Sequence, residues 1–147
     1  MVYAGRVKRV AALSALALIA GCGVSSASPD VGTPFAGGVG KTVEVRVTSG
    51  QRFSLSVPDN DSVGDDWEVA TKPDPGVAAF VSEEYAGDPD SKGPGSGGTG
   101  YYVYTAKNPG TTSVVLYNCW RCGPAKTPKD DFDRAHSGDA TFHIIVT

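Results

Sequence analysis

The sequence has 147 residues, with 16 Asp and Glu against 13 Lys and Arg, and its net charge at pH 7 is −3. This acidic balance argues against nucleic-acid binding, because contact with a phosphate backbone requires an excess of positive charge. The length fits a single domain that is large enough to bury a real core.

Residues 1–21 have the features of a bacterial lipoprotein signal peptide. The positive n-region holds the basic residues Arg6, Lys8 and Arg9. The apolar run over 10–20 is too short to span a bilayer comfortably. It ends in LIAGC, residues 18–22, which resembles a lipobox. That resemblance implies cleavage before Cys22 and acylation of this cysteine, for example with palmitate. An ordinary secretory signal with an unrelated Cys22 is the alternative.

The segment after the signal, residues 22–39, is rich in Gly, Ser and Pro and is predicted to be a flexible tether. The folded domain is then expected over residues 40–147. Loss of three basic residues with the signal brings the net charge near −6.

Two or more acyl chains give stable anchoring. We therefore expect an envelope protein held by lipid on the outer face of the cytoplasmic membrane or its equivalent.

The domain contains short runs of β-branched and aromatic residues that alternate with polar ones and are bounded by Gly, Pro, Asn and Asp. No segment has a sustained helical period. About seven strands in so short a domain predict an all-β fold, an antiparallel sandwich. The expected strands cover residues 41–47, 52–57, 67–71, 77–82, 101–106, 111–118 and 140–147.

Three stretches fall outside these strands, at residues 60–67, 87–100 and 118–139. Long loops in a compact domain are usually functional or disordered. The first loop lies in VPDNDSVGDDW, residues 57–67, which carries four aspartates around one glycine. A calcium-loop template that starts at Asp59 is matched by Asp61 and Gly64. It fails at Val63 and Ala70, which have no side-chain oxygen. We expect neither a metal nor a cofactor.

The three loops together resemble those of the chagasin-type inhibitors of papain-like cysteine proteases, over residues 40–147. Family members have an Asn-Pro-Thr-Thr-Gly loop with a following aromatic, matched here by Asn60, Gly64 and Trp67. The second family motif, Gly-x-Gly-Gly before a strand, is matched by Gly95, Ser96, Gly97 and Gly98. The third, Arg-Pro-Trp after a strand, is matched by Asn118, Cys119 and Trp120.

The resemblance implies an immunoglobulin-like sandwich whose loops wedge into the cleft of a papain-like protease, which is then the expected partner. An inhibitor of this kind is not cleaved by the protease and needs no nucleophile of its own. Trp120 is the expected anchor, and Trp67 is expected to fix the first loop to the core. The protease-binding residues implied are Asn60, Asp61, Ser62, Val63, Gly64, Gly95, Ser96, Gly97, Gly98, Asn118, Cys119 and Trp120.

The sequence departs from the family pattern at several of these positions. Asp61, Ser62 and Val63 stand in place of Pro-Thr-Thr, while Asn118 and Cys119 replace Arg and Pro. These departures support an alternative function, in which the same fold is an envelope binding module for another protein or a cell-wall ligand. We do not expect an enzyme, because no Ser-His-Asp set stands out in the sequence.

The pair Cys119 and Cys122 allows three interpretations. Outside the cytoplasm the pair is expected to be oxidised, and a disulfide could replace the rigidity of the family's proline, with a loop-closure contribution of ~2 kcal/mol. A thioredoxin-like site would need a second cysteine at Ala125 and a helix after it. A zinc site would need His136 and His143 as further ligands, but the strand pattern around His143 predicts a solvent-facing side chain.

The predicted lipid anchor can be tested through Cys22. Changing Cys22→Ala removes the acylated residue, so the protein should move from the membrane to the soluble exported fraction. Fractionation followed by immunoblotting measures this shift. Membrane association equal to that of the wild type would contradict the lipobox assignment.

Overall fold

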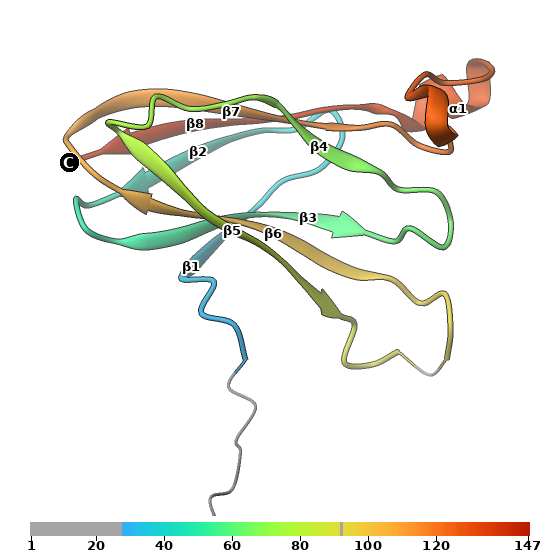
Figure 1. Ribbon diagram of the computed structural model, residues 1–147, viewed down its shortest axis with the longest axis horizontal. Coiled ribbons are helices and arrows are strands. Elements are labelled where there is room, and N and C mark those ends of the chain that lie inside the picture. The colour runs from blue at the N-terminus through green and yellow to red at the C-terminus, as the bar shows by residue number, and fades with distance from the viewer. Residues whose placement is uncertain (1–27, 92) are drawn as a thin grey trace, which may run out of the picture.

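A computed structural model describes residues 28–91 and 93–147 of the chain. The predicted signal peptide and Cys22 lie outside these residues. The described residues form two four-stranded sheets packed face to face, with a short helix, α1, at one end (Figure 1). Within them, no helix is long and apolar enough to cross a membrane. The all-β sandwich predicted from the alternating runs is confirmed.

The two sheets have the strand orders β1-β3-β6-β5 and β2-β8-β7-β4. The pairs β1–β3 and β2–β8 are parallel, and the other pairs are antiparallel. The strands are β1 (Thr33–Ala36), β2 (Thr42–Val47), β3 (Arg52–Asp59), β4 (Trp67–Thr71), β5 (Ala78–Gly87), β6 (Gly98–Ala106), β7 (Gly110–Asn118) and β8 (Gly138–Val146).

The core lies between the sheets and is built from alternate residues of each inner strand. Phe53, Leu55, Leu116, Phe142 and Ile144 are all fully buried there. Because successive side chains on a strand point to opposite faces, the period of two in the sequence places one alternate set of residues of each strand on this inner face. Burial of these side chains fixes the register of the strands and so the positions of the loops that join them.

Strand β1 was not predicted, because its residues were assigned to the tether over 22–39. Thr33–Ala36 pairs with β3, and Phe35 packs edge-on against Phe53 with 6.4 Å between ring centroids. The folded part of the chain therefore includes residues before 40, within the segment that was predicted to be a tether. Four residues are too few for a periodic signal to be recognised.

Two further elements interrupt the long segment between β7 and β8. They are the 3₁₀ turn η1 (Gly123–Ala125) and the helix α1 (Asp131–His136). The sequence predicted no helix here, because the six residues of α1 are too few for a sustained helical period. Its start is nevertheless capped, since the Asp130 carboxylate accepts a hydrogen bond from the Asp133 N–H at 2.8 Å.

The last residue of β3, Asp59, is a partly buried carboxylate beside Gly100, where an added Cβ would lie 3.1 Å from Asp59 Oδ2. Burial raises the pKa of Asp59. The surrounding negative charges raise it further, and they belong to Asp65, Asp61, Glu83 and Asp66. Ionised Asp59 is therefore destabilising for the folded domain at neutral pH.

The position of the domain boundary predicts the effect of truncation. A domain that begins at residue 40 lacks β1 and exposes one side of Phe53, so its free energy of unfolding should fall by roughly 3 kcal/mol relative to residues 28–147. Urea unfolding measures the difference. A domain that begins at residue 31 loses two exposed contacts of Asp30, the ion pair with Arg52 and the hydrogen bond from the Gly32 N–H. Its free energy of unfolding should fall by less than about 1 kcal/mol. Equal midpoints for all three would contradict a structural role for β1.

The raised pKa of Asp59 predicts a pH dependence of stability. The folded domain holds this proton more tightly than the unfolded chain, so its stabilising effect is present at acid pH and is lost as pH rises through the raised pKa. Asp59→Asn should therefore unfold at a higher temperature than the wild type at pH 7, with little difference at pH 3. Asp139→Asn, an exposed change on β8, is the control for loss of one charge. A destabilised Asp59→Asn at pH 7 would contradict this prediction.

Candidate functional site: three linked loops at one end of the sandwich

Three loops meet at one end of the sandwich, at the right of Figure 1. The first, residues 60–66, joins β3 to β4, and the second, residues 88–97, joins β5 to β6. The third, residues 119–137, joins β7 to β8 and carries η1 and α1. The three stretches that stood apart in the sequence therefore lie on one edge, which we call the three-loop edge.

The first loop is a compact turn organised by Asn60. The Asn60 carbonyl accepts hydrogen bonds from the N–H groups of Val63 at 3.1 Å and Gly64 at 3.3 Å. Its side-chain Oδ1 also accepts a hydrogen bond, from the Ser62 N–H at 3.2 Å. Gly64 has φ +116°, so the positive φ expected there is present. Asp61, Ser62 and Val63 are left exposed at the tip.

The side chain of Asn60 also ties the first loop to the second. Its Nδ2 donates to the Gly95 carbonyl at 3.0 Å. Gly97 has φ +75°, and a Cβ there would lie 2.8 Å from the Cβ of Asn60, so only glycine fits. At Gly98 an added Cβ would lie 2.2 Å from a carbonyl oxygen of β5. Ser96 is exposed and bonds within its own loop. The Gly-x-Gly-Gly motif thus permits close approach of backbones.

Arg121 ties the third loop to the first. Its N–H donates to the Gly64 carbonyl at 2.8 Å and its Nε donates to the Val63 carbonyl at 3.2 Å. A Cβ on Gly64 would lie 2.4 Å from Arg121 Cγ. Arg121 has φ +53°, an uncommon conformation for a residue with a side chain. The sequence pattern did not single it out, because this link depends on two distant loops.

Asn118 and Cys119, which the family resemblance made contact residues, point inward. Only 3% of Asn118 and 1% of Cys119 is exposed. Asn118 Nδ2 donates to Asp65 Oδ1 at 2.8 Å, and Asn118 Oδ1 accepts from the Asp66 N–H at 2.9 Å. The Cys119 N–H donates to the Asp66 carbonyl at 2.9 Å. Both residues therefore position the loops, and neither side chain is available to a partner.

The aspartates of the first loop have structural roles that a simple solvated loop would not require. Asp65 Oδ2 accepts from the Asn60 N–H at 3.0 Å, so its carboxylate joins Asn60 to Asn118. Asp66 forms an ion pair with Lys126, and the hydrogen bond that the lysine donates to the Asp66 carboxylate raises the pKa of Lys126. Asp61, in contrast to Asp65 and Asp66, has no such side-chain contact with another loop residue and is exposed at the tip.

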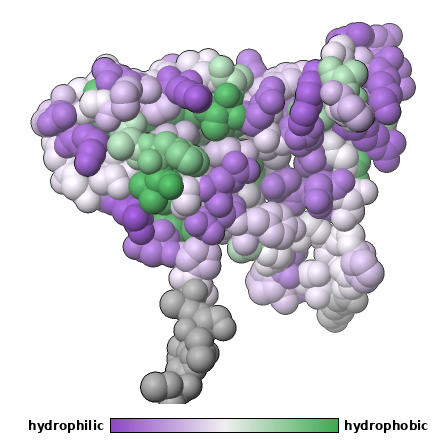
Figure 2. Space-filling view, in the orientation of Figure 1, coloured by the Kyte–Doolittle hydropathy of each residue, from purple (hydrophilic) through white to green (hydrophobic). Residues whose placement is uncertain are grey.

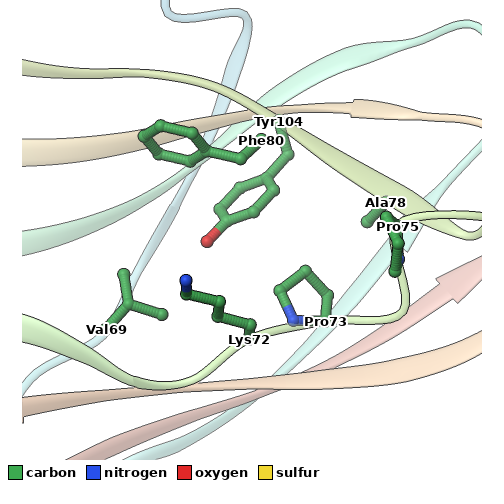
Figure 3. Close-up of a pocket in the computed structure, with 7 residues that line it drawn as sticks. All are labelled: Val69, Lys72, Pro73, Pro75, Ala78, Phe80 and Tyr104. Atoms are coloured by element: carbon green, nitrogen blue, oxygen red, sulfur yellow. The ribbon is translucent and has the colours of Figure 1, made fainter.

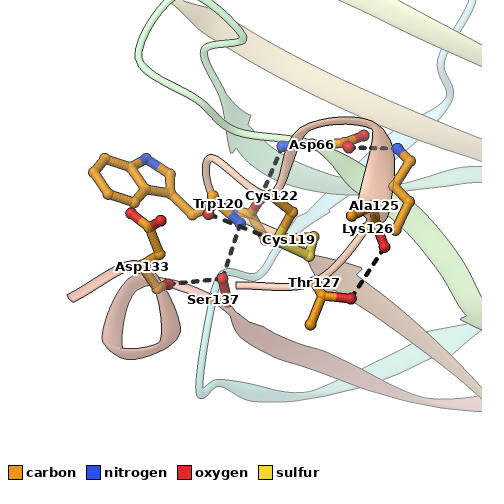
Figure 4. Close-up of a disulfide and its surroundings, with 10 residues drawn as sticks. Asp66, Cys119, Trp120, Cys122, Ala125, Lys126, Thr127, Asp133 and Ser137 are labelled. Atoms are coloured by element: carbon orange, nitrogen blue, oxygen red, sulfur yellow. Dashed lines mark hydrogen bonds and ion pairs between the residues drawn. A yellow bond between two sulfur atoms is a disulfide. The ribbon is translucent and has the colours of Figure 1, made fainter. Parts of the chain in front are cut away.

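A disulfide joins Cys119 to Cys122, as predicted, and both cysteines are buried (Figure 4). Trp120 lies inside this short ring. The Trp120 N–H donates to Ser137 Oγ at 2.9 Å, and that hydroxyl donates to the Asp133 carbonyl at 2.8 Å. The chain of hydrogen bonds connects the third loop to the helix α1.

Trp120 is half-buried rather than fully exposed, because α1 packs beside it. The Trp120 ring lies 5.5 Å from Phe132 and 4.7 Å from His136, measured between centroids. Arg121 Cζ lies 4.3 Å from the centre of the Trp120 ring. Two features of the sequence could have indicated this helix. Asp130 is a favourable N-cap residue, and the charges along α1 are acidic in the first turn and basic in the last.

The other predicted anchor, Trp67, has the position expected of it. It is partly buried against the core, and its Nε1 donates to the Pro58 carbonyl at 2.9 Å. Among the described residues, no group of three or more His, Cys, Asp or Glu is placed to hold a metal ion. His143 is exposed on β8, as predicted, with its Nδ1 2.9 Å from Ser113 Oγ.

A separate hollow of about 440 Å³ lies between β4 and β5, away from the three-loop edge (Figure 3). Lys72 and Tyr104 point into it, and Phe80 lies at its rim. Burial and Glu83 raise the pKa of Tyr104 to about 12, so its hydroxyl stays neutral. Figure 2 shows apolar atoms gathered over this part of the molecule, whereas the loop end is mostly polar.

Three solved structures are similar to this chain. PbICP-C in complex with falcipain-2 has a TM-score of 0.56 and 10% identity, over 79% of this chain and 100% of that one. The inhibitor EhICP2 of Entamoeba histolytica has a TM-score of 0.49 and 11% identity, over 78% and 96%. Amebosin has a TM-score of 0.49 and 18% identity, over 79% and 98%.

None of the curated protein sequences matches this chain significantly. The family description "Chagasin family peptidase inhibitor I42" matches residues 46–134. These residues include the first two loops, the disulfide and Trp120, and they make up more than half of the chain. The chain therefore belongs to the chagasin family of peptidase inhibitors.

Proposed function

We propose that this protein is a reversible inhibitor of papain-like cysteine proteases that fills the substrate cleft with the three-loop edge and is not cleaved. The observation that carries the proposal is the pair of links from the first loop. Asn60 is bonded to Gly95 of the second loop, and Gly64 is bonded to Arg121 of the third. The first loop is thus bonded to both of the other loops, which supports a single binding surface at this end of the domain.

Links of this kind favour binding because they reduce the conformational entropy that the loops lose in a complex. The exposed tip of the first loop, Asp61 to Val63, is free to enter a cleft, and 43% of Val63 is accessible. A standard interface buries about 1,200–2,000 Å² in total, which three adjacent loops can supply. The action is steric, so the inhibitor needs no nucleophile of its own.

Two observations support a cysteine protease as the partner. The family is one of peptidase inhibitors, and one structural neighbour was solved with falcipain-2. The departures from the family motifs differ in their expected effect on contact with the protease. Asn118 and Cys119 are buried, so they change how the third loop is held, whereas Asp61 and Val63 change the surface that a protease meets.

The lipid anchor belongs to the same proposal. If Cys22 carries lipid, only residues 23–32 separate it from β1. An extended chain spans at most ~3.5 Å per residue, so a tether of this length keeps the domain within a few nanometres of the membrane. The inhibitor would then act on proteases that reach the outer face of the envelope.

Inhibition kinetics test the proposal with the domain of residues 28–147, which contains both sheets. It should inhibit a papain-like enzyme competitively and remain intact on a gel after prolonged incubation. Trp120→Ala should weaken binding by at least ~2 kcal/mol, roughly thirtyfold, because an aromatic side chain held on a rigid loop is a typical hot spot. Asp61→Ala should have little effect, or tighten binding where the cleft is acidic, since like charges repel.

Circular dichroism and thermal unfolding must show that each variant is folded before the constants are compared. Absence of inhibition across a panel of papain-like enzymes at micromolar domain would contradict the proposal. The binding-module alternative, with the exposed tip at Asp61 and Val63 adapted to another ligand, would then be favoured.

A further inference from the structure

The helix α1 carries an exposed aromatic residue that the fold does not require. Phe132 is 60% exposed, the highest value among the large hydrophobic residues described. The only buried residue of α1 is Asp133, and the two sheets are complete without the helix. Contiguous exposed apolar patches often mark interaction sites, whereas single exposed apolar residues are common, so the residues around Phe132 decide whether it belongs to such a patch.

Phe132 is nevertheless held in place. Its ring lies 4.3 Å from His136 and 5.5 Å from Trp120, measured between centroids. The backbone beneath it is fixed by the Asp130 cap and by the Ser137 hydroxyl, which bonds the Asp133 carbonyl. His136 Nδ1 lies 2.8 Å from the Phe132 carbonyl. A ring fixed in this way loses little side-chain entropy when it is covered.

The three rings form a continuous aromatic cluster, which we define as Trp120, Phe132 and His136. Figure 1 shows α1 at the same end of the sandwich as the three-loop edge, and Figure 4 shows Trp120 directed toward the α1 side. A shallow depression of about 180 Å³ lies next to the cluster. Its lining includes Trp120 and His136 of the cluster together with Pro58 and Trp67. The cluster is thus contiguous with the first and third loops.

We propose that α1, which the third loop carries beyond its disulfide, is a fourth contact element of the inhibitor in addition to the three linked turns, with Phe132 as its anchor. The partner surface is an apolar patch of the papain-like protease beside its cleft, on the side that the third loop occupies. The inference rests on the proposed function, because the cluster continues the edge that enters the cleft. Buried aromatic anchors near the centre of an interface carry most of its affinity.

The test compares inhibition constants of the wild-type domain, residues 28–147, with those of Phe132→Ala and Phe80→Ala. Phe80 is the matched control, because it is 55% exposed but lies by the hollow between β4 and β5. Phe132→Ala should weaken inhibition about tenfold, while Phe80→Ala should stay within about twofold of the wild type. Phe132→Tyr, which keeps the ring, should retain most of the affinity.

A double-mutant comparison separates contact from positioning, since Phe132 also packs on Trp120. In the Trp120→Ala background, Phe132→Ala should still weaken inhibition at least about threefold if the ring touches the protease. No further loss in that background would show that Phe132 only positions Trp120, and would overturn the proposal. So would a wild-type inhibition constant for Phe132→Ala alone.

The wild-type measurement distinguishes the two levels of inference. If the wild-type domain does not inhibit, the proposed function fails and the fourth contact element fails with it. If the wild type inhibits and Phe132→Ala inhibits equally well, only the fourth contact element is overturned.

Discussion

The hydrogen bonds of the first loop to its two neighbours are the constraint on which the functional end of the molecule depends. Asn60 reaches the second loop and the Gly64 carbonyl accepts from the third. Both contacts need glycine, at Gly97 and Gly64, since any Cβ would collide. Because separate loops on a sheet usually move independently, these bonds turn three mobile segments into one surface of defined shape.

The sandwich and the polar groups beneath the loops support this surface. The buried Asn118 joins Asp65 to the backbone of Asp66, and the disulfide closes the third loop at Cys119 and Cys122. A buried amide that loses its hydrogen bonds costs free energy of folding, so the network resists rearrangement. The acidic character of the first loop thus arises largely from structural needs. Only its exposed tip is free to vary with the partner.

Much of the fold could be predicted from the sequence, because apolar residues alternate along each long strand and turns separate them. The strand β1 was missed, since four residues carry no clear period, and α1 was missed for a similar reason. Trp67, Trp120 and the glycines were found through the family motifs. Arg121 and Phe132 were not, because their roles come from contacts between segments far apart in the chain. Burial of Asn118 likewise depends on tertiary packing.

Amide hydrogen exchange of the domain, alone and with a papain-like protease, tests most directly whether the three loops act as one surface. In the free domain, the bonded amides of Arg121 and Cys119 should already exchange slowly. Protease should then slow exchange in residues 60–66, 93–97 and 119–122 together and leave the β4–β5 hollow unchanged. Protection confined to a single loop, or centred on that hollow, would contradict the account.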